Sequence, residues 1–218
     1  MDRHLSLVNK PWIQNYPSHI NWSTKLTCSD IYDGFKRSSV TNPNKIAIIF
    51  MGEKWTYAQT SFIINKCISG LQKIGVKKGD RIAIALPNSP YYVFFFYACV
   101  AIGAIVVNIN PLHTIKDICE QLSITKPKII ITINVSDIFK KIDKACRSYP
   151  LERIILCSIQ DVIPFYKRVL LKLFNRNKIL NVTGSDRIVH YRELVNNKGN
   201  FIQNHINPKE DIAILQFT

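Results

Sequence analysis

Short apolar runs alternate with helical segments through the middle of the chain, and this alternation constrains the fold more than any other feature. Strands are predicted at residues 81–86, 105–109, 128–133 and 153–157, where the chain is almost wholly apolar. Helices are predicted between them at 90–102, 114–125 and 136–146, from apolar residues at helical spacing. Apolar strands separated by helices are typical of a parallel sheet that helices cover on both faces. We therefore predict an α/β protein with a doubly wound, mostly parallel sheet.

The flanking segments complete a division of the chain into four parts. Residues 1–29 are expected to form an N-terminal arm, and 30–160 an α/β subdomain that opens with a hairpin (45–57) and a helix (58–74) ended by Gly75. Residues 161–210 are expected to hold a basic amphipathic helix and an irregular, Asn-rich insertion. Residues 211–218 read as a last strand, the first of a nucleotide-binding region that is missing from the chain.

The uncharged run from Tyr91 to Val107 is not predicted to cross a membrane. Ser89 and Pro90 are typical of an N-cap and a first helical position, and Gly103 of a helix stop. A helix over 90–102 would be about 20 Å long, against a hydrocarbon core of about 30 Å. A buried helix followed by a buried strand is the better interpretation.

The charge balance admits two explanations. The chain has 29 Lys and Arg against 15 Asp and Glu, a net charge of +14. Such an excess favours nucleic acid or an anionic membrane as a partner. The 34 Ile, 20 Lys and 18 Asn residues also have codons rich in A and T, so genome composition can account for part of it. Both explanations stay open at this stage.

Cysteine use and the start of the chain indicate a reducing compartment. The cysteines form no C-x-x-C pair and have no histidine at zinc spacing, so we interpret them as buried free thiols: Cys28, Cys67, Cys99, Cys119, Cys146 and Cys157. The first thirty residues lack the continuous apolar stretch of a signal peptide. The cytoplasm is therefore the default location.

Residue patterns for catalysis are sparse. The chain has neither G-x-G-x-x-G nor G-x-x-x-x-G-K-[ST], so an NAD or FAD domain is not expected. Position rules for such sheets put a ligand crevice at loops 87–89, 108–111 and 134–136, which hold amides and hydroxyls but no base or carboxylate pair. The histidines are isolated: His4, His19, His113, His190 and His205. His113 is the best placed, and a structural or solvent-exposed role is preferred for it.

Residues 162–178 form the most informative surface segment. The window carries five basic residues and no acid, with apolar residues at helical spacing. This pattern is typical of a helix on an anionic bilayer. The expected membrane-surface residues are Lys167, Arg168, Val169, Leu170, Lys172 and Leu173. The alternative is a helix packed on its own domain; nucleic-acid binding is less favoured, because no aromatic stacking platform accompanies the charge.

Several segments, in order along the chain, are similar to the opening of the adenylate-forming enzymes. They are Trp55-Thr56-Tyr57, residues 75–83 (GVKKGDRIA), Pro87-Asn88 and residues 103–112 (GAIVVNINPL). Within that superfamily the chain most resembles bacterial long-chain fatty acid–CoA ligases, through residues 11–17 (PWIQNYP), 107–112, the basic helix after Pro164 and residues 211–218 (DIAILQFT). One departure is that Gln59 and Thr60 stand where the family often has Glu-Leu, which puts local packing or the charge at a helix start in doubt.

The resemblance implies an activity and also what the chain lacks. The complete enzyme would convert a fatty acid, ATP and CoA to acyl-CoA, AMP and diphosphate through an acyl-adenylate, with Mg²⁺. Thr218 would be the first residue of the loop of Ser, Thr and Gly, ending in Lys-Gly, that holds the ATP phosphates. The magnesium-holding Glu, the ribose-binding Asp, the hinge and the Lys of the mobile C-terminal domain would lie beyond it. No catalytic residue is therefore assigned, and no cofactor is expected for the chain alone.

The expectation is an N-terminal fragment of a long-chain fatty acid–CoA ligase, inactive by itself. Two alternatives are a retained noncatalytic module that binds a membrane or a partner, and one half of a split enzyme. The candidate partners are an anionic membrane surface and a separately encoded remainder, whereas nucleic acid is not expected. The cytoplasm, with peripheral attachment to the inner face of the membrane, is the expected location.

Overall fold

The structure of the protein is a computed structural model that describes residues 12, 15–21, 30–174, 178–182 and 186–217, with the side chains of 172–174 left out. Its helices are α1 (Ile31–Thr41), α2 (Tyr57–Lys73), α3 (Pro90–Ile102), α4 (Ile115–Thr125), α5 (Ser136–Arg147), α6 (Phe165–Phe174) and α7 (Tyr191–Leu194), with a 3₁₀ turn η3 (Ile159–Val162). Its strands are β1 (Ile46–Phe50), β2 (Glu53–Thr56), β3 (Arg81–Ile84), β4 (Ile105–Asn108), β5 (Ile129–Ile133), β6 (Arg153–Cys157), β7 (Ile188–His190) and β8 (Ile214–Leu215).

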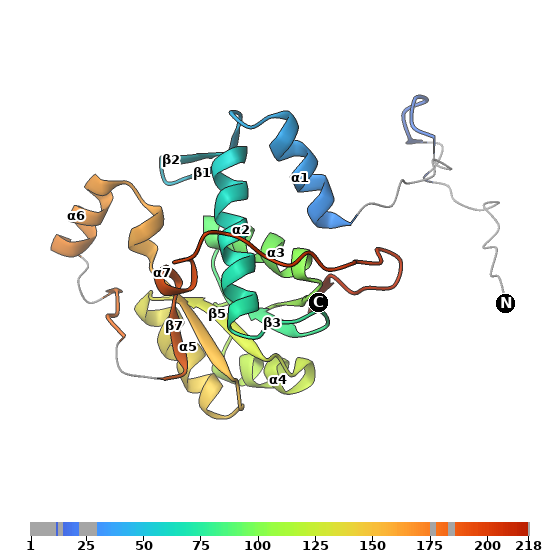
Figure 1. Ribbon diagram of the computed structural model, residues 1–218. Helices are drawn as coiled ribbons and strands as arrows, with labels where there is room; N and C mark the ends of the chain where they lie inside the picture. The colour runs from blue at the N-terminus through green and yellow to red at the C-terminus, as the bar shows by residue number, and fades with distance from the viewer. Residues whose placement is uncertain (1–11, 13–14, 22–29, 175–177, 183–185, 218) are drawn as a thin grey trace.

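The described strands form two sheets, and the larger one confirms the predicted fold class. Six strands lie in the order β7-β6-β5-β3-β4-β8, and every neighbouring pair is parallel. β1 and β2 form the predicted antiparallel hairpin. In Figure 1, α2 and α3 pack together on one side of the large sheet and α4 and α5 on the other. The sheet is therefore doubly wound and covered on both faces.

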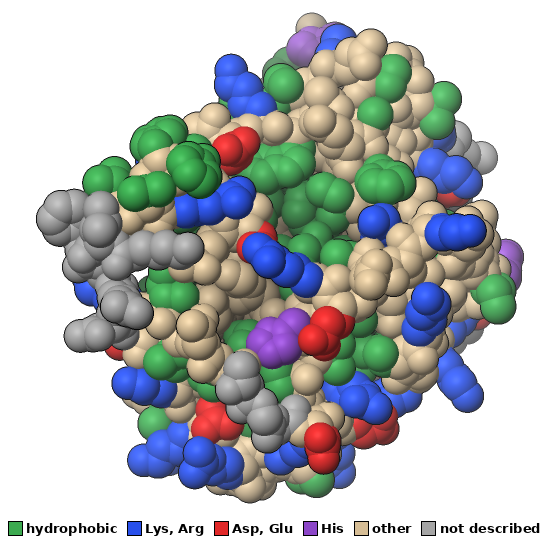
Figure 2. Space-filling model, turned by 60° about the vertical axis from the view of Figure 1, so that its left-hand side comes forward, with side chains coloured by type: hydrophobic (Ala, Val, Ile, Leu, Met, Phe, Trp, Pro, Cys, Tyr) green, Lys and Arg blue, Asp and Glu red, His purple; other side chains and the backbone are tan. Residues whose placement is uncertain are grey.

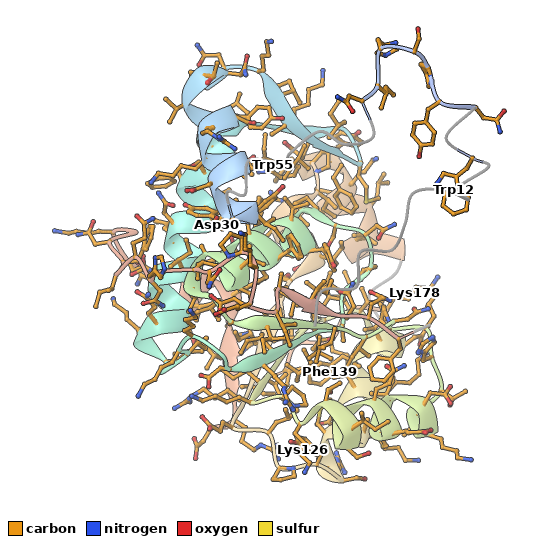
Figure 3. The ribbon with its side chains drawn as sticks, turned by 90° about the vertical axis from the view of Figure 1, so that its right-hand side faces the viewer. Trp12, Asp30, Trp55, Lys126, Phe139 and Lys178 are labelled. Carbon is orange, nitrogen blue, oxygen red and sulfur yellow. The ribbon has the colours of Figure 1, made fainter. Side chains whose placement is uncertain are left out.

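Burial follows the apolar pattern of the sequence. All five residues of β5 are buried, as expected for a central parallel strand. Tyr91, Phe94 and Phe95 of α3 are at most 1% exposed, so this helix lies in the core. No helix among the described residues is long and apolar enough to cross a membrane. Figure 3 shows Trp55 and Asp30 on one side of the large sheet, and Phe139 and Lys126 on the other.

Local signals set the ends of the helices. Thr56 and Gln59 form a capping box at the start of α2. The side-chain oxygen of Gln59 accepts a hydrogen bond from the Thr56 N–H (2.9 Å), so the box forms although Glu is replaced by Gln. Thr114 and Asp117 form a capping box at the start of α4. Gly103 ends α3 in the left-handed region, with φ of +78°.

The predicted start of α3 is confirmed, with Ser89 at the N-cap position and Pro90 at the first helical position. Ser89 occupies the N-cap position of α3 with extended backbone, but its side chain makes no capping hydrogen bond. Its hydroxyl is buried and has no hydrogen-bond partner among the residues that the structure describes. Pro90, at the first helical position, already starts the helix with a suitable φ and has no N–H that needs an acceptor.

The segment after η3 is more regular than the sequence pattern indicates. β7 lies in the part expected to be irregular, yet it pairs with β6 at the edge of the sheet. Residues 196–213 then cross α2 and α3 and reach the opposite edge, where β8 pairs with β4 (Figure 1). Gln72 holds this crossing segment by two hydrogen bonds to the backbone of Ile202, at 2.7 and 3.0 Å. Its far end is held by an ion pair of 2.7 Å between Lys78 and Asp211.

Candidate functional site

The carboxyl ends of the parallel strands form the candidate ligand-binding edge. The chain runs from β3 to its neighbour β4, then returns to the other side of β3 with β5, β6 and β7. Ligands of doubly wound proteins bind beside such a reversal of strand order. The three loops singled out in the sequence lie at this edge, and two cavities open along it, one on each side of the reversal.

The first cavity has a volume of about 610 Å³ and lies at the ends of β3, β4 and β8. Its lining residues are Ile84, Leu86, Pro87, Asn88, Tyr92, Asn108, Ile109, Asn110, Pro111, Leu112, Ile138 and Gln216. The Tyr92 hydroxyl donates to Asn108 Oδ1 (2.8 Å), and Asn108 Nδ2 donates to Gln216 Oε1 (2.7 Å). This chain of hydrogen bonds fixes the residues that follow β8 against α3 and β4.

The first cavity offers neutral polar groups only. Its lining holds amides and one phenol, with no lysine, arginine or carboxylate. A triphosphate needs cationic or clustered N–H donors, and Mg²⁺ prefers carboxylate oxygens. The described residues therefore do not by themselves fit ATP or magnesium. Thr218, expected to open the phosphate loop, lies outside the described residues, two positions after Gln216.

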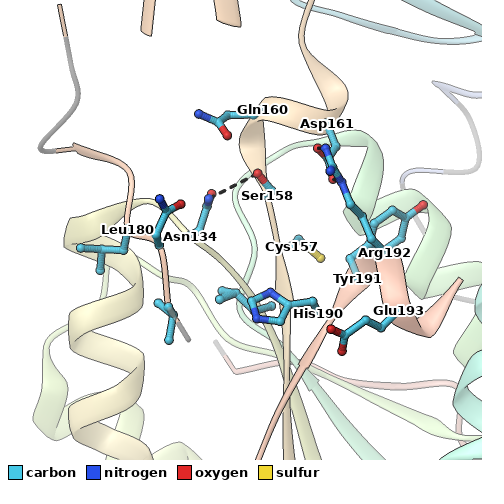
Figure 4. A pocket seen from close by; sticks show the side chains of 13 residues that line it. Asn134, Cys157, Ser158, Gln160, Asp161, Leu180, His190, Tyr191, Arg192 and Glu193 are labelled. Carbon is cyan, nitrogen blue, oxygen red and sulfur yellow. Dashed lines mark hydrogen bonds and ion pairs between the residues drawn. The ribbon is translucent and has the colours of Figure 1, made fainter. Parts of the chain in front are cut away.

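The second cavity has a volume of about 440 Å³ and lies at the ends of β5, β6 and β7 (Figure 4). Asn134, after β5, donates to Ser158 Oγ (3.3 Å) and accepts from the Ile159 N–H (3.0 Å). These bonds tie the loop after β6 to the end of β5. Arg192 donates two N–H groups to the carboxylate of Asp161, with Nε 2.9 Å from Oδ2.

Two tyrosines lie close to this pair, and one of them, Tyr191, also lines the cavity. The rings of Tyr91 and Tyr191 meet edge to face with centroids 4.7 Å apart. Burial raises the pKa of both phenols well above the ordinary value, so both stay neutral. The Tyr91 hydroxyl donates to the carbonyl of Ser158 (3.0 Å). The arrangement positions polar groups, and none of the hydrogen bonds given above for the described residues joins a nucleophile to a base.

The described cysteines are free thiols, as predicted, and all but Cys119 are buried. Cys67, Cys99, Cys146 and Cys157 are buried free thiols. Burial raises the pKa of Cys99 and of Cys146 to about 12, so these thiols are not ionised at neutral pH. Cys119 is half-buried, and Cys28 lies outside the described residues. Within the described part of the chain, no group of His, Cys, Asp and Glu could hold a metal ion.

His113 lies in a hydrogen-bonded position beside α4. Gln121 Nε2 is 3.2 Å from His113 Nδ1 and donates to it, and the ammonium of Lys141 is 3.4 Å from the carbonyl of His113. His190 contributes to the second cavity, at the end of β7, whereas His4 lies outside the described residues. Sequence reasoning missed the pair of Asp161 and Arg192, because nothing local connects two residues 31 positions apart.

The residues predicted to lie at a membrane surface are on α6, where Arg168 and Val169 share a small pocket with Gln160 and Arg192 of the second cavity. Lys167 and Arg168 are half-buried, while Val169 and Leu170 are exposed. The side chains of Lys172 and Leu173 lie outside the described residues. Figure 2 shows hydrophobic side chains gathered over α6, with Lys and Arg side chains beside them.

Comparisons with known proteins agree with this architecture. Residues 35–218 match the family described as AMP-binding enzyme. The long-chain-fatty-acid–CoA ligase of Bacillus subtilis is 31% identical over 212 residues, which cover 96% of this chain and 38% of the relative. The 4-coumarate–CoA ligase 3 of Arabidopsis thaliana is 38% identical over 97 residues, which cover 44% of this chain and 17% of the relative. The chain thus spans less than two fifths of the length of these curated relatives.

A solved structure shares the fold. A long-chain-fatty-acid–CoA ligase from Archaeoglobus fulgidus superposes with a TM-score of 0.68 at 19% identity, over 88% of this chain and 35% of that one. This likeness independently confirms the α/β sheet architecture. The resemblance drawn from the sequence motifs is confirmed as well. The chain therefore belongs to the AMP-binding enzyme family, and it corresponds to the N-terminal region of long-chain fatty acid–CoA ligases.

Proposed function

We propose that these residues form the N-terminal part of a long-chain fatty acid–CoA ligase, which makes acyl-CoA from a fatty acid, ATP and CoA. The observation that carries the proposal is the match to the Bacillus subtilis ligase over 96% of this chain. The match to the 4-coumarate ligase covers 44%. A fatty acid is therefore favoured over a phenylpropanoid acid as the substrate of the complete enzyme.

The contribution of this chain would be structural. Its sheet carries β8 beside β4, and the bonds from Tyr92 to Asn108 to Gln216 hold the residues after β8 at the first cavity. A phosphate-binding loop that continued from there would start at the ligand edge of the sheet. Because the lining of the first cavity is uncharged, residues beyond these 218 would supply the contacts to ATP and Mg²⁺. We expect no acyl-CoA formation by the 218-residue chain alone.

A chimaeric enzyme tests this proposal. Residues 1–218 would replace the matching region of the Bacillus subtilis ligase, and acyl-CoA formation from hexadecanoic acid and from 4-coumaric acid would be measured. We expect turnover of the fatty acid by the chimaera and none by the lone chain. Turnover by the lone chain, or tight and saturable binding of ATP to it, would show that the proposal is wrong. So would a folded chimaera without activity on the fatty acid.

A split enzyme is a second candidate, and the edge of the sheet favours it. Among the described residues, β8 has β4 as its sheet neighbour and stands at the end of the strand order. Such an edge presents N–H and C=O groups that another strand can pair with. Mixing this chain with the separately expressed remainder of the Bacillus subtilis ligase should then restore acyl-CoA formation. Absence of activity, with both pieces folded, would count against assembly in trans.

A noncatalytic module is the third candidate. It would bind a membrane or a partner chain through α6, where apolar side chains are exposed. This candidate and the ligase proposal agree on location. We propose the cytoplasm, with peripheral attachment at the inner face of the membrane.

A further inference from the structure

Side chains continue the pairing of β8 with β4 where the backbone pairing stops. β8 has two residues, and its register with β4 ends at Leu215, opposite Val107. β4 goes on to Asn108, and the next residue after β8 in the same parallel register is Gln216. At this position Asn108 Nδ2 donates to Gln216 Oε1 at 2.7 Å. The side-chain hydrogen bond therefore extends the pairing by one position, toward the end of the chain.

Hydrogen bonds connect helix α3 to the backbone after β8. The Tyr92 hydroxyl donates to Asn108 Oδ1 at 2.8 Å, and Asn108 in turn donates to Gln216. Gln216 Nε2 then donates to the carbonyl oxygen of Phe217 at 3.3 Å. We call Tyr92, Asn108 and Gln216 the polar bridge. It runs from the third residue of α3, past the end of β4, to the last backbone carbonyl that the structure describes.

The carbonyl of Phe217 fixes the direction of the polar bridge. A carbonyl oxygen only accepts hydrogen bonds, so the NH₂ group of Gln216 must face it, and Gln216 Oε1 is left facing Asn108. Asn108 must then donate through its own NH₂ group, which leaves its Oδ1 for the Tyr92 hydroxyl. The opposite orientation of both amides would set two acceptors against each other at Phe217. Each group of the bridge therefore has one role, as donor or as acceptor.

Both ends of β8 are held by elements of the core. The ring of the half-buried Tyr92 lies nearly parallel to that of Phe96, one turn further along α3, with centroids 6.1 Å apart. On the other side of β8, the ion pair of 2.7 Å between Lys78 and Asp211 holds the chain before it enters the strand. A strand of two residues is thus fastened by side chains before and after it. The polar bridge is the fastening on the side of the ligand edge.

We propose that Tyr92 and Asn108 are positioning residues for the phosphate-binding loop of the complete ligase, because they set the direction in which the main chain leaves β8. The inference rests on the proposed function, in which the residues after Gln216 continue into the loop that holds ATP. Neither Tyr92 nor Asn108 needs to touch a substrate, since each acts through Gln216. Loops that bind phosphate through backbone N–H groups depend on the course of their main chain.

The first measurement uses the 218-residue chain without any ligand. Hydrogen exchange of residues 211–218 would be followed by mass spectrometry in the wild type and in Tyr92→Phe, which loses one oxygen and keeps the ring. We expect exchange in this segment to become faster by about three- to tenfold, as for the loss of one neutral hydrogen bond. Tyr97→Phe is the matched control on the same helix, because no hydrogen bond of the Tyr97 hydroxyl is found among the described residues. It should leave the exchange unchanged.

The second measurement uses the chimaera of residues 1–218 with the rest of the Bacillus subtilis ligase. Tyr92→Phe and Gln216→Met should each raise the KM for ATP by about three- to tenfold and leave the KM for hexadecanoic acid unchanged. The double variant should be no worse than the weaker of the two single variants, because both changes break the same bridge. A purely structural role would instead lower kcat through loss of folded enzyme, with both KM values unchanged.

The two measurements separate this inference from the proposed function. An inactive, folded parent chimaera would contradict the proposed function, and hydrogen exchange in the lone chain would still decide whether the polar bridge orders residues 211–218. An active parent chimaera whose folded variants keep the wild-type KM for ATP would overturn the positioning role alone. Equal exchange in Tyr92→Phe and in the wild type would overturn it as well. Thermal melts would establish that each variant is folded.

Discussion

Replacing Gly70 by alanine tests how closely α2 and α7 are packed. Gly70 lies within α2, where alanine is ordinarily favoured over glycine by about 1 kcal/mol. A Cβ at this position would lie 2.3 Å from the backbone oxygen of Leu194 and 2.7 Å from its Cγ. Because the closest atom belongs to the backbone of α7, a rotamer change cannot relieve the overlap.

The expected loss of stability is the cost of overpacking less the gain in helix propensity. Ordinary van der Waals contact begins near 3.4 Å, so α2 and α7 must separate by roughly 1 Å. Overpacking of this kind costs about 1–3 kcal/mol, and more when backbone must move. After the gain in helix propensity, we expect Gly70→Ala to lower the free energy of unfolding by about 1–2 kcal/mol. For a chain of this size, the melting temperature should fall by about 2–8 °C.

Gly34→Ala is the matched control. Gly34 also lies in a helix, α1, but a Cβ there meets nothing within 4 Å. Only the propensity term applies, so this variant should be more stable by about 0.5–1 kcal/mol. Urea unfolding followed by circular dichroism would measure both variants beside the wild type. The same chemical change should therefore have opposite signs at the two positions.

A local readout completes the test. α7 carries Tyr191 and Arg192 into the second cavity, and the Val195 N–H donates to the carbonyl of Tyr191 at 3.0 Å. Hydrogen exchange of the Val195 amide should become faster in Gly70→Ala and stay unchanged in Gly34→Ala. Equal or greater stability of Gly70→Ala, with unchanged exchange, would refute the close packing of α2 on α7.

Other contacts lead to further expected outcomes. Arg192→Met removes the bidentate partner of Asp161, whose side chain is 12% exposed, and should lower the free energy of unfolding in urea by about 1–2 kcal/mol; unchanged stability would show that water replaces the guanidinium. The hydrogen bond from Lys78 holds the pKa of Asp211 below its ordinary value of 3.8. The ionised carboxylate therefore adds stability above pH 3.8, and this part is lost as the pH falls through the lower pKa of the folded state. Asp211→Asn should remove that acid-dependent part from urea unfolding curves recorded above and below pH 3.8. Gln59→Glu keeps the capping-box acceptor and adds a negative charge at the start of α2, so thermal melts should show a gain of about 0.3–1 kcal/mol; a loss would show that the neutral amide is required.

Elements with strong local signals were predicted closely. The bounds of α3 agree with the prediction, because Pro90 and Gly103 mark its ends and every position between them is uncharged. The strands β4 and β6 begin at the predicted residues, 105 and 153. β7 was missed because three residues with half-buried side chains carry too little pattern. The last strand was placed at 211–218, whereas β8 occupies two residues only.

The candidate site was predicted in position but not in composition. The loops after β3, β4 and β5 were identified, since strand ends follow from the apolar runs and ligand edges follow from strand ends. Gln216 joins Asn108 from a position 108 residues away, and no local pattern could connect them. Arg192 reaches Asp161 for the same reason, through the pairing of β7 with β6.

The amino-acid sequence alone determined the fold class, the helix ends and the family, because these depend on residues within a few positions of one another or on motifs in order. Tertiary structure alone decided the strand order, the partners across both cavities and the direction in which α6 faces. Those features depend on which distant segments pair and on which side of a helix finds hydrogen-bond acceptors. The carbonyl of Met51 holds Lys167 inward, and the apolar face of α6 is left outward as a consequence.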